Sequence, residues 1–211
     1  MIIIMCGGAY ENFKQHKALT KINGERLVDR TIRLLKENNV EDIYVSATDP
    51  NFIDYKVLKH ENTYKQVNGK QEGYWLDAYY PTDKPCIYLH GDVYYSEDAI
   101  KKILNYNPKV NTMIGNQWAL NENHDKVGEP FGWIIVDQKK FRKAIEETKK
   151  LQDEGKCDRM PVSWELYQVL NGHDVNGFDI STDTYLPISD ITVDIDYPSQ
   201  IEKLENKVKN G

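Results

Sequence analysis

The sequence predicts an α/β fold organised around a parallel β-sheet, and three observations support this class. The residues Ile2–Met5 form a short apolar run, which is typical of a strand buried on both faces. Residues 27–38 repeat apolar side chains at helical spacing, and residues 42–46 form a second strand, so the chain opens with a βαβ unit. Residues 86–89 form another apolar run, which we expect at the centre of the sheet.

The remaining segments continue this alternation of strands and helices. Three of them have the character of strands: residues 64–67, 112–114 and 133–137. Residues 48–59 predict a turn followed by a short helix. Later helices are predicted at residues 96–104, 139–152, 162–170 and 199–209. The helix at 139–152 places Phe141, Ile145 and Thr148 on its inner side.

Size and charge restrict the class of protein. The chain has 211 residues and a formal net charge of -6. This length corresponds to one α/β domain, so we expect a single domain that spans residues 1–211. Proteins that bind nucleic acids usually present a basic face, so the acidic balance predicts no nucleic-acid partner. A small anionic substrate is compatible with this charge, because a local cluster of lysines is enough to bind it.

The cysteines and the N-terminus indicate the compartment. Cys6, Cys86 and Cys157 lie far apart and form no Cys-x-x-Cys pair, which indicates reduced thiols and excludes a classical zinc module. The N-terminal apolar run is too short for a signal peptide or a membrane span. We therefore expect a cytoplasmic protein without a membrane partner. The sequence leaves open whether the chain forms a homo-oligomer.

A glycine pair follows the first strand. Gly7 and Gly8 allow the backbone to turn with positive φ and to present N–H groups to an anion. Lys14 and Lys17 lie just downstream and add positive charge, so we predict that this loop binds a polyphosphate. The alternative interpretation is a tight turn with no ligand. The spacing of the loop matches neither a Walker loop nor a dinucleotide fingerprint.

An aspartate follows the predicted central strand, in the run His90-Gly91-Asp92-Val93. Ligands of open α/β folds bind at the carboxyl edge of the sheet, where this carboxylate is expected. The alternative role for Asp92 is to cap the next helix. Ser96 is the better residue for that cap, so a functional role for Asp92 is favoured.

Two further acids lie near the end of the chain, in the run ITVDID. Asp194 and Asp196 fall on the same face of an extended segment, with Val193 and Ile195 on the other face. Two carboxylates on one face repel each other unless a cation lies beside them, and a metal ion would provide that cation. The alternative for Asp196 is a favourable interaction with the dipole of the last helix.

Three motifs now stand in a particular order: a strand with Gly7-Gly8 and a downstream Lys17-Ala18-Leu19, a strand ending in Gly91-Asp92, and a late Asp-Ile-Asp-x-Pro. This arrangement resembles the nucleotidyltransferase family of enzymes that make sugar nucleotides and CDP-activated alcohols. The run Asn23-Gly24-Glu25-Arg26-Leu27 also resembles a turn of that family. The resemblance implies a Rossmann-like, GT-A-type fold with three α/β/α layers and a mixed, mostly parallel central sheet.

The resemblance also implies roles for individual residues. Lys17 would contact substrate phosphate, and Lys14 would stand in for an arginine that the family usually has in this loop. Asp92 would bind Mg²⁺ together with Asp194 or Asp196. The remaining residues implied in binding the nucleotide are Cys6, Gly7, Gly8, Ala9, Gln71 and Gly73, of which Gln71 and Gly73 would recognise the base.

The implied activity is the transfer of a nucleoside monophosphate from an NTP, such as CTP, to a phosphorylated small molecule, with release of pyrophosphate. Two other classes stay open. A GT-A glycosyltransferase would use an Asp-x-Asp motif, but Tyr94 stands where the second acid belongs. A non-catalytic homologue would bind the NTP without turnover. The sequence does not identify the base or the acceptor.

The acceptor pocket has the weakest signal in the sequence. An aromatic box for a quaternary ammonium is one interpretation of the large aromatic side chains, although a place in the core is favoured for each of them. These residues are Trp75, Tyr79, Trp118, Trp133, Trp164 and Tyr167. Glu129 and Glu165 are candidates for binding acceptor hydroxyls or an amine, with a surface role as the alternative.

Overall fold

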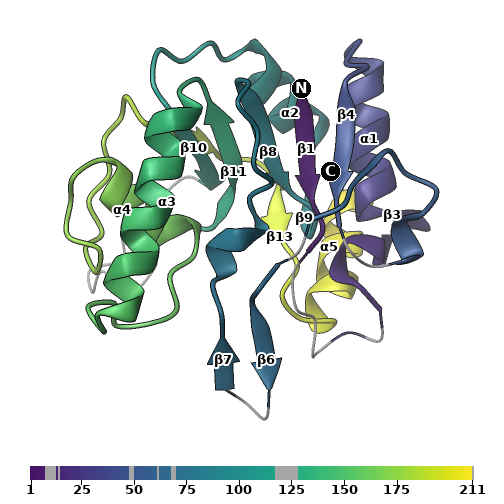
Figure 1. Cartoon of the computed structure of the whole chain (residues 1–211). Helices are drawn as coiled ribbons and strands as arrows, with labels where there is room; N and C mark the ends of the chain where they lie inside the picture. Colours follow the sequence, from purple (N-terminus) through teal and green to yellow (C-terminus); the bar gives the residue numbers. More distant parts are fainter. Residues whose placement is uncertain are drawn as a thin grey trace.

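The central sheet lies in the middle of the molecule, with helices on both of its faces (Figure 1). The structure is a computed structural model that describes residues 1–7, 13, 15–47, 50–60, 62–67, 70–116 and 128–210. Within these residues the sheet has seven strands, in the order β12 (Tyr185–Ile188), β10 (Thr112–Asn116), β11 (Pro130–Ile135), β8 (Cys86–His90), β1 (Ile2–Met5), β4 (Ile43–Ser46) and β5 (Val57–Leu58).

The pairing of these strands confirms a mixed, mostly parallel sheet. β1 lies between β4 and β8 and runs parallel to both, with Ile4 opposite Val45 on one side and Leu89 on the other. The βαβ opening and the central position of residues 86–89 are therefore confirmed. β11 is antiparallel to β8 and to β10, whereas β10 and β12 are parallel.

The helices form the two outer layers. α1 (Leu27–Glu37) and α2 (Glu97–Asn105) pack on one face of the sheet, and α3 (Gln138–Asp153) and α4 (Ser163–Leu170) pack on the other. β1 contributes to both cores, since Ile2 and Ile4 pack with α1 and α2, while Ile3 and Met5 pack with α3 and α4. This alternation along a fully apolar strand explains the predicted three-layer architecture, which the structure confirms.

Short elements surround the carboxyl end of β1. They are η1 (Lys17–Leu19), β2 (Lys21–Ile22) paired with β3 (Glu25–Arg26), η2 (Pro50–Phe52), β6 (Lys65–Val67) paired with β7 (Lys70–Glu72), η3 (Trp75–Ala78), and β9 (Val93–Tyr94) paired with β13 (Val193–Asp194). The last helix, α5 (Ser199–Asn210), follows β13, and its Leu204 packs in a small core with Ile22 and Ile195. The C-terminal segment is thereby anchored beside the start of the chain.

Some predicted elements differ from the structure. Residues 48–59 were predicted as a turn followed by a short helix; the described residues 50–59 contain the 3₁₀ turn η2 and then, at residues 57–58, the edge strand β5 of the sheet. Residues 65–67 form a strand, but it belongs to a separate hairpin. The sequence patterns do not identify β12, because Pro187 interrupts its apolar run. The structure accepts this proline because β12 is an edge strand, and one side of an edge strand forms no hydrogen bonds to a neighbouring strand. Among the described residues, no helix combines the length and the apolar character that a membrane crossing requires.

Candidate active site

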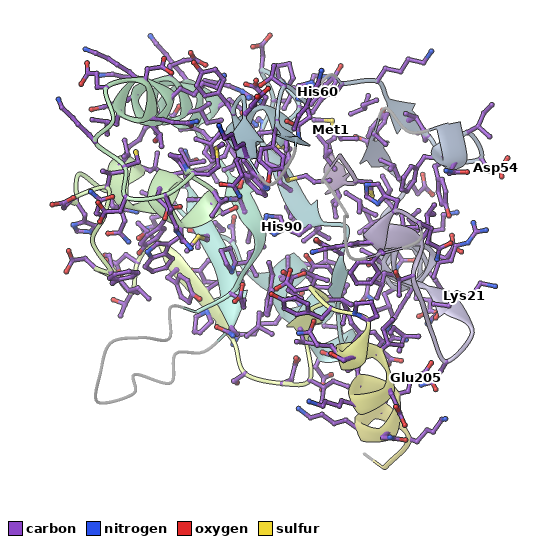
Figure 2. All side chains as sticks on the ribbon, turned by 90° about the horizontal axis from the view of Figure 1, so that it is seen from below. Met1, Lys21, Asp54, His60, His90 and Glu205 are labelled. Atoms are coloured by element: carbon purple, nitrogen blue, oxygen red, sulfur yellow. The ribbon has the colours of Figure 1, made fainter. Side chains whose placement is uncertain are left out.

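A cavity of about 330 Å³ opens at the carboxyl end of β1 and β8. Figure 2 views this edge of the sheet from below and places His90 near the middle of the molecule, with Lys21 and Glu205 toward its periphery. The cavity is lined by residues from the strands β1, β8 and β11, from η1 and η3, from the start of α4 and from the C-terminal segment. Five of the predicted site residues are among them: Gly7, Lys17, Asp92, Asp194 and Asp196.

Gly91 brings the end of β8 against the loop that carries Lys17. Its backbone N–H donates to the carbonyl of Met5 at 2.9 Å. A Cβ on residue 91 would lie 2.5 Å from Sγ of Cys6, 2.7 Å from the Met5 carbonyl oxygen and 3.3 Å from Cβ of Ala18. Only a residue without a Cβ can lie this close to Cys6, Met5 and Ala18, so packing requires glycine at position 91. The consequence is that Asp92 lies beside Lys17.

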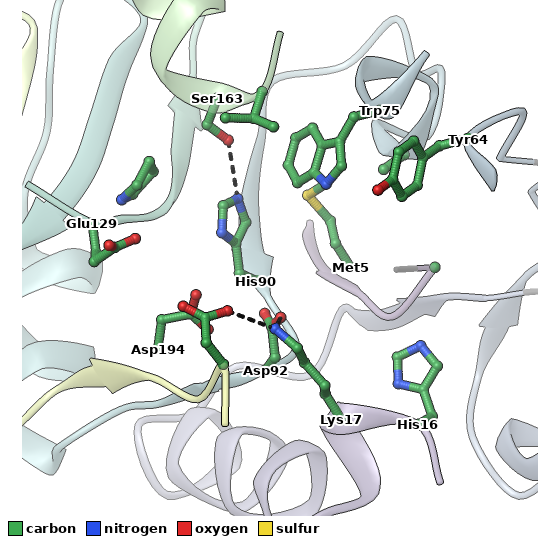
Figure 3. Close-up of a pocket in the computed structure, with 15 residues that line it drawn as sticks. Met5, His16, Lys17, Tyr64, Trp75, His90, Asp92, Glu129, Ser163 and Asp194 are labelled. Carbon is green, nitrogen blue, oxygen red and sulfur yellow. Dashed lines mark hydrogen bonds and ion pairs between the residues drawn. The ribbon is translucent and has the colours of Figure 1, made fainter. Parts of the chain in front are cut away.

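Lys17 joins carboxylates from distant parts of the chain. Its Nζ lies 3.1 Å from Oδ2 of Asp92 and 2.9 Å from Oδ1 of Asp196. Figure 3 shows Lys17 and Asp92 pointing toward each other in this part of the cavity. The lysine backbone is held in place because Ala18 and Leu19, the other residues of η1, are buried. Burial alone would lower the pKa of Lys17, but Asp92, Asp194 and Asp196 together raise it above its usual value.

Asp194 is placed by the pairing of β13 with β9, in which it lies opposite Val93. The N–H of Ile195 donates to the carbonyl of Asp92 at 3.1 Å, which ties the two segments together. Among the described residues, Oδ1 of Asp194 is buried and has no hydrogen-bond partner. Burial, followed by the charges of Asp92 and Asp196, raises the pKa of Asp194.

The Asp196 side chain contacts Lys17, whereas the backbone N–H groups ahead of the last helix have another partner. Oε1 of Gln200 accepts from the backbone N–H groups of Asp196 and Tyr197, both at 2.7 Å, so a different side chain serves the start of α5. The Asp196 carboxylate instead contacts Lys17. The segment 194–196 therefore directs two carboxylates at the cavity, as its alternation predicted.

These carboxylates fit a divalent cation. Mg²⁺ takes oxygen ligands and is commonly held by one or two carboxylates, and the partnerless Oδ1 of Asp194 is an oxygen that such an ion would satisfy. In the described part of the chain, no group of three or more acidic, His or Cys side chains stands ready to hold a metal. Lys17 is the cation that the structure places between Asp92 and Asp196.

A second polar group in the cavity has no counterpart in the predicted site. His90, the last residue of β8, faces Ser163 at the start of α4, with Nε2 and Oγ 3.3 Å apart. Ser163 Oγ lies 2.6 Å from the hydroxyl of Tyr79, which is buried. Burial lowers the pKa of His90, so its ring is neutral near pH 7. A polar residue at the end of a buried apolar run is the sequence signal that points to His90.

The glycine loop is described only in part. Gly7 lines the cavity, but its φ is not positive, contrary to the prediction. Its carbonyl accepts from Nδ2 of Asn62 at 3.2 Å. The Cys6 side chain is buried against Gly91 and does not line the cavity, and burial raises the pKa of its thiol. Gly8, Ala9 and Lys14 lie outside the described residues.

The residues predicted to recognise the base lie on or next to the β6–β7 hairpin. Gln71 is exposed and does not line the cavity, although its Nε2 donates to the hydroxyl of Tyr64 at 3.4 Å, and Tyr64 is a lining residue. Gly73 has a φ of +77° and packs so closely on Thr63 that a Cβ would meet its carbonyl oxygen. The structure thus assigns Gly73 to the turn after the hairpin.

Most acceptor candidates belong to the core. Tyr79, Trp133, Trp164 and Tyr167 are buried, and Trp118 lies outside the described residues. Trp75 does line the cavity, as does Glu129. Burial and the nearby Asp196 raise the pKa of Glu129. Glu165 is buried and structural: it accepts from the N–H of Val162 at 2.9 Å and from Nε of Arg159 at 2.6 Å.

Comparison with known proteins places the chain among enzymes that use nucleoside triphosphates. A model of the MobA-like NTP transferase domain family matches residues 2–158. No curated protein matches the sequence.

Three solved structures resemble this one over nearly their whole length. The CTP:phosphocholine cytidylyltransferase of Streptococcus pneumoniae is 15% identical, with a TM-score of 0.57 over 98% of each chain. The inositol-1-phosphate CTP transferase of T. maritima is 14% identical, with a TM-score of 0.56 over 100% of this chain and 96% of the other. The 4-diphosphocytidyl-2C-methyl-D-erythritol synthase of Anaerococcus prevotii is 12% identical, with a TM-score of 0.58 over 99% and 97%. At these identities the likeness establishes the fold, which is the one that nucleotidyltransferases use.

Proposed function

The chain belongs to the MobA-like NTP transferase domain family, and from this premise we propose that it transfers a nucleoside monophosphate from an NTP to a phosphorylated small molecule. The observation that carries the proposal is the convergence of Lys17, Asp92, Asp194 and Asp196 at one end of the sheet, beside Gly7. These residues come from segments up to 179 positions apart. Such a cluster of one cation and several acids suits a metal-bound triphosphate.

The reaction is an in-line displacement at the α-phosphorus. An oxygen of the acceptor phosphate forms the new bond, the bond between the α-phosphorus and its bridging oxygen to the β-phosphate breaks, and pyrophosphate leaves with that electron pair. The acceptor phosphate is already ionised, so no side chain has to act as nucleophile. The protein contributes alignment and a charge environment that stabilises the phosphate oxygens.

We propose that Asp92 and Asp194, with Asp196, hold Mg²⁺, which when bound neutralises charge on the phosphate oxygens. Lys17 contacts the phosphates as a point charge and positions them. The backbone at Gly7 leaves room for the nucleotide, because the described atoms nearest to a Cβ there would be those of the Asn62 side chain, at 3.9 Å. Lys14 is proposed to add a second positive charge from the same loop.

The whole chain, residues 1–211, is proposed to act as one nucleotidyltransferase domain. The family model ends at residue 158, but Ser163, Asp194 and Asp196 line the cavity. The C-terminal segment is needed to complete the site, since two of its three acids come from residues 194–196. The extent of the structural likeness, which covers 98% or more of this chain, supports the same boundary.

The acceptor is proposed to be a sugar phosphate or a phosphorylated alcohol. Related structures include enzymes named for phosphocholine and for inositol 1-phosphate. Trp75 and Glu129 also line the cavity; Trp75 offers an aromatic face, and Glu129 offers a carboxylate that lies near Asp92 and Asp196. Such a surface accepts hydroxyl groups or a positively charged group next to the acceptor phosphate.

The test is the release of pyrophosphate. Thermal shifts with ATP, CTP, GTP and UTP in the presence of Mg²⁺ select the nucleotide, and pyrophosphate is then measured with a panel of phosphorylated sugars and alcohols. We expect one nucleotide and one acceptor class to give turnover that chelation of the metal abolishes. Release of a nucleoside diphosphate from an NDP-sugar would instead identify a glycosyltransferase, and nucleotide binding without turnover on any acceptor would indicate a non-catalytic homologue.

A further inference from the structure

Lys17 contacts the same carboxylates that are proposed to bind the divalent cation. Its Nζ lies within hydrogen-bond distance of Oδ2 of Asp92 and Oδ1 of Asp196, at 3.1 and 2.9 Å. Only 16% of the Lys17 side chain is exposed, compared with 30% for Asp92 and 44% for Asp196. The ammonium group is therefore the more enclosed partner, and it holds together two acids that would otherwise repel each other.

A divalent cation and this ammonium group compete for the same oxygens. Mg²⁺ binds carboxylate oxygens at about 2.0–2.1 Å and needs their lone pairs directed at it. A metal ion and an ammonium group on one pair of oxygens would lie a few ångströms apart and repel each other strongly. For the metal to bind both Asp92 and Asp196, Lys17 has to leave them.

Excess metal can displace Lys17 from these acids, but Lys17 leaves them most readily when another anion binds it, because a largely enclosed charge without a partner is unfavourable. The triphosphate is such an anion. Lys17 and Gly7 line the same cavity, and the four-carbon stem of lysine has several rotatable bonds. The backbone stays in place during this movement, since Ala18 and Leu19 are buried and the N–H of Thr20 donates to the Lys17 carbonyl.

We propose that Lys17 is a placeholder for the divalent cation: it occupies Asp92 and Asp196 in the nucleotide-free protein and moves to the triphosphate when the metal enters. This inference rests on the proposed function, because it takes an NTP as the anion that receives Lys17. Its consequence is that metal and nucleotide each raise the affinity of the protein for the other. Without nucleotide, the lysine keeps the metal affinity low.

The experiment measures Mn²⁺ binding to the full chain without nucleotide or acceptor, by the electron paramagnetic resonance signal of free Mn²⁺. Lys17→Met and Lys17→Gln remove the competing charge, and we expect both to bind Mn²⁺ at least about tenfold more tightly than the unaltered chain. Lys17→Arg keeps a positive charge and is expected to show no gain. Lys21→Met is the matched control, because Lys21 is exposed and does not line the cavity.

A second measurement uses the unaltered chain and does not depend on the folding of any variant. Labelling of lysine amines, followed by peptide mass mapping, reports how accessible each Nζ is. We expect saturating Mn²⁺ to increase the labelling of Lys17 severalfold relative to metal-free protein, while labelling of Lys21 stays the same. A Lys17 labelling rate that Mn²⁺ leaves unchanged would overturn the proposal.

The outcomes separate this inference from the proposed function. If Lys17→Met and Lys17→Gln are folded and bind Mn²⁺ no more tightly than the unaltered chain, Lys17 is not a placeholder, whatever the catalytic activity. If both variants gain affinity but no acceptor yields pyrophosphate, the competition between lysine and metal stands and the proposed reaction fails. Melting curves of each variant establish that the protein compared is folded.

Discussion

On one side of the cavity Lys17 is joined to Asp92 and Asp196 by ion pairs, whereas on the other side His90, Ser163 and Tyr79 are joined by hydrogen bonds between neutral groups. The first side draws its residues from η1, the end of β8 and the C-terminal segment. The second draws them from β8, α4 and the segment after η3. The side with Lys17, Asp92 and Asp196, here called the ion-paired side, suits a highly charged ligand. The side with His90, Ser163 and Tyr79, here called the neutral side, suits an uncharged part of a ligand that is recognised by its shape.

The two sides also differ in how they connect to the core. Tyr79 is buried and packs edge-on to Phe141 of α3, with ring centroids 5.2 Å apart. Substitutions among His90, Ser163 and Tyr79 should therefore lower the free energy of unfolding. Asp92 and Asp196 retain exposed surface. Changes on the ion-paired side should therefore affect activity more than stability, and the following predictions test this difference.

The largest expected effect is that of Asp92→Asn on activity. The substitution removes one of the proposed metal ligands and one partner of Lys17, so we expect the rate of pyrophosphate release to fall by more than about 100-fold. Urea unfolding should show a much smaller relative change. Asp83→Asn is the control, because Asp83 is exposed and lies outside the cavity. Near-normal turnover of the Asp92 variant would remove Asp92 from the site.

Lys17→Ala should lower kcat/KM by about 10- to 100-fold, which corresponds to the loss of one hydrogen bond to a charged group. The measurement is steady-state pyrophosphate release with varied NTP. Lys21→Ala, changed in the same way four positions along the chain, should behave like the unaltered protein. A Lys17 variant that matches the Lys21 variant would contradict the proposed role of Lys17 in binding phosphate.

Gly7, which lines the cavity, and Gly91, which directly precedes the lining residue Asp92, should respond differently to substitution by alanine. Gly91→Ala places a Cβ 2.5 Å from Sγ of Cys6 and 2.7 Å from the Met5 carbonyl oxygen, so we expect a loss of about 1–3 kcal/mol in the free energy of unfolding. Among the described residues, a Cβ added by Gly7→Ala would meet nothing closer than Asn62 at 3.9 Å. The Gly7 variant should keep its stability, measured by urea unfolding, and lose affinity for NTP, measured by thermal shift. Equal stability of the two variants would show that residue 91 is not packed as described.

The smallest expected effect is on the neutral side. Ser163→Ala leaves the buried hydroxyl of Tyr79 without its serine partner, which should cost about 1 kcal/mol of unfolding free energy. Adding Tyr79→Phe removes the other half of the pair, so the double variant should lose less than the sum of the two single losses. Urea unfolding of all four proteins measures this coupling, and strictly additive losses would argue against the hydrogen bond.

Much of the fold follows from local patterns. The run Ile2–Met5 predicts a strand buried on both faces, and the apolar run at residues 86–89 predicts a central strand. Both lie in the middle of the sheet, where the structure pairs β1 with β8 in parallel register. Ser96 caps α2 through a hydrogen bond from the N–H of Ala99, as predicted. The edge strands β5 and β12 were not identified, because one is only two residues long and the other contains a proline. Neither has the periodicity that a sequence pattern can reveal.

The candidate site likewise contains residues that the sequence predicts and residues that only the structure reveals. The chemistry of Lys17, Asp92, Asp194 and Asp196 is visible in the sequence, because acids and lysines next to glycines or strand ends are conspicuous against an apolar background. Gln71 and Gly73 were expected in the site and do not line the cavity, whereas Ser163 and Tyr64 do. Their places depend on how η3, α4 and the β6–β7 hairpin pack around the sheet, which involves contacts between distant segments.

Local residue order was therefore enough to specify the α/β layers, the central strands and the charged groups of this protein, since strand burial, helix capping and charge are properties of short segments. Which residue each charged group contacts could be known only from the tertiary structure. Lys17 meets Asp196 across 179 residues because β13 pairs with β9 and Gly91 lets β8 approach η1. Contacts of this kind depend on where the backbone places distant segments, and no spacing along the sequence encodes that distance.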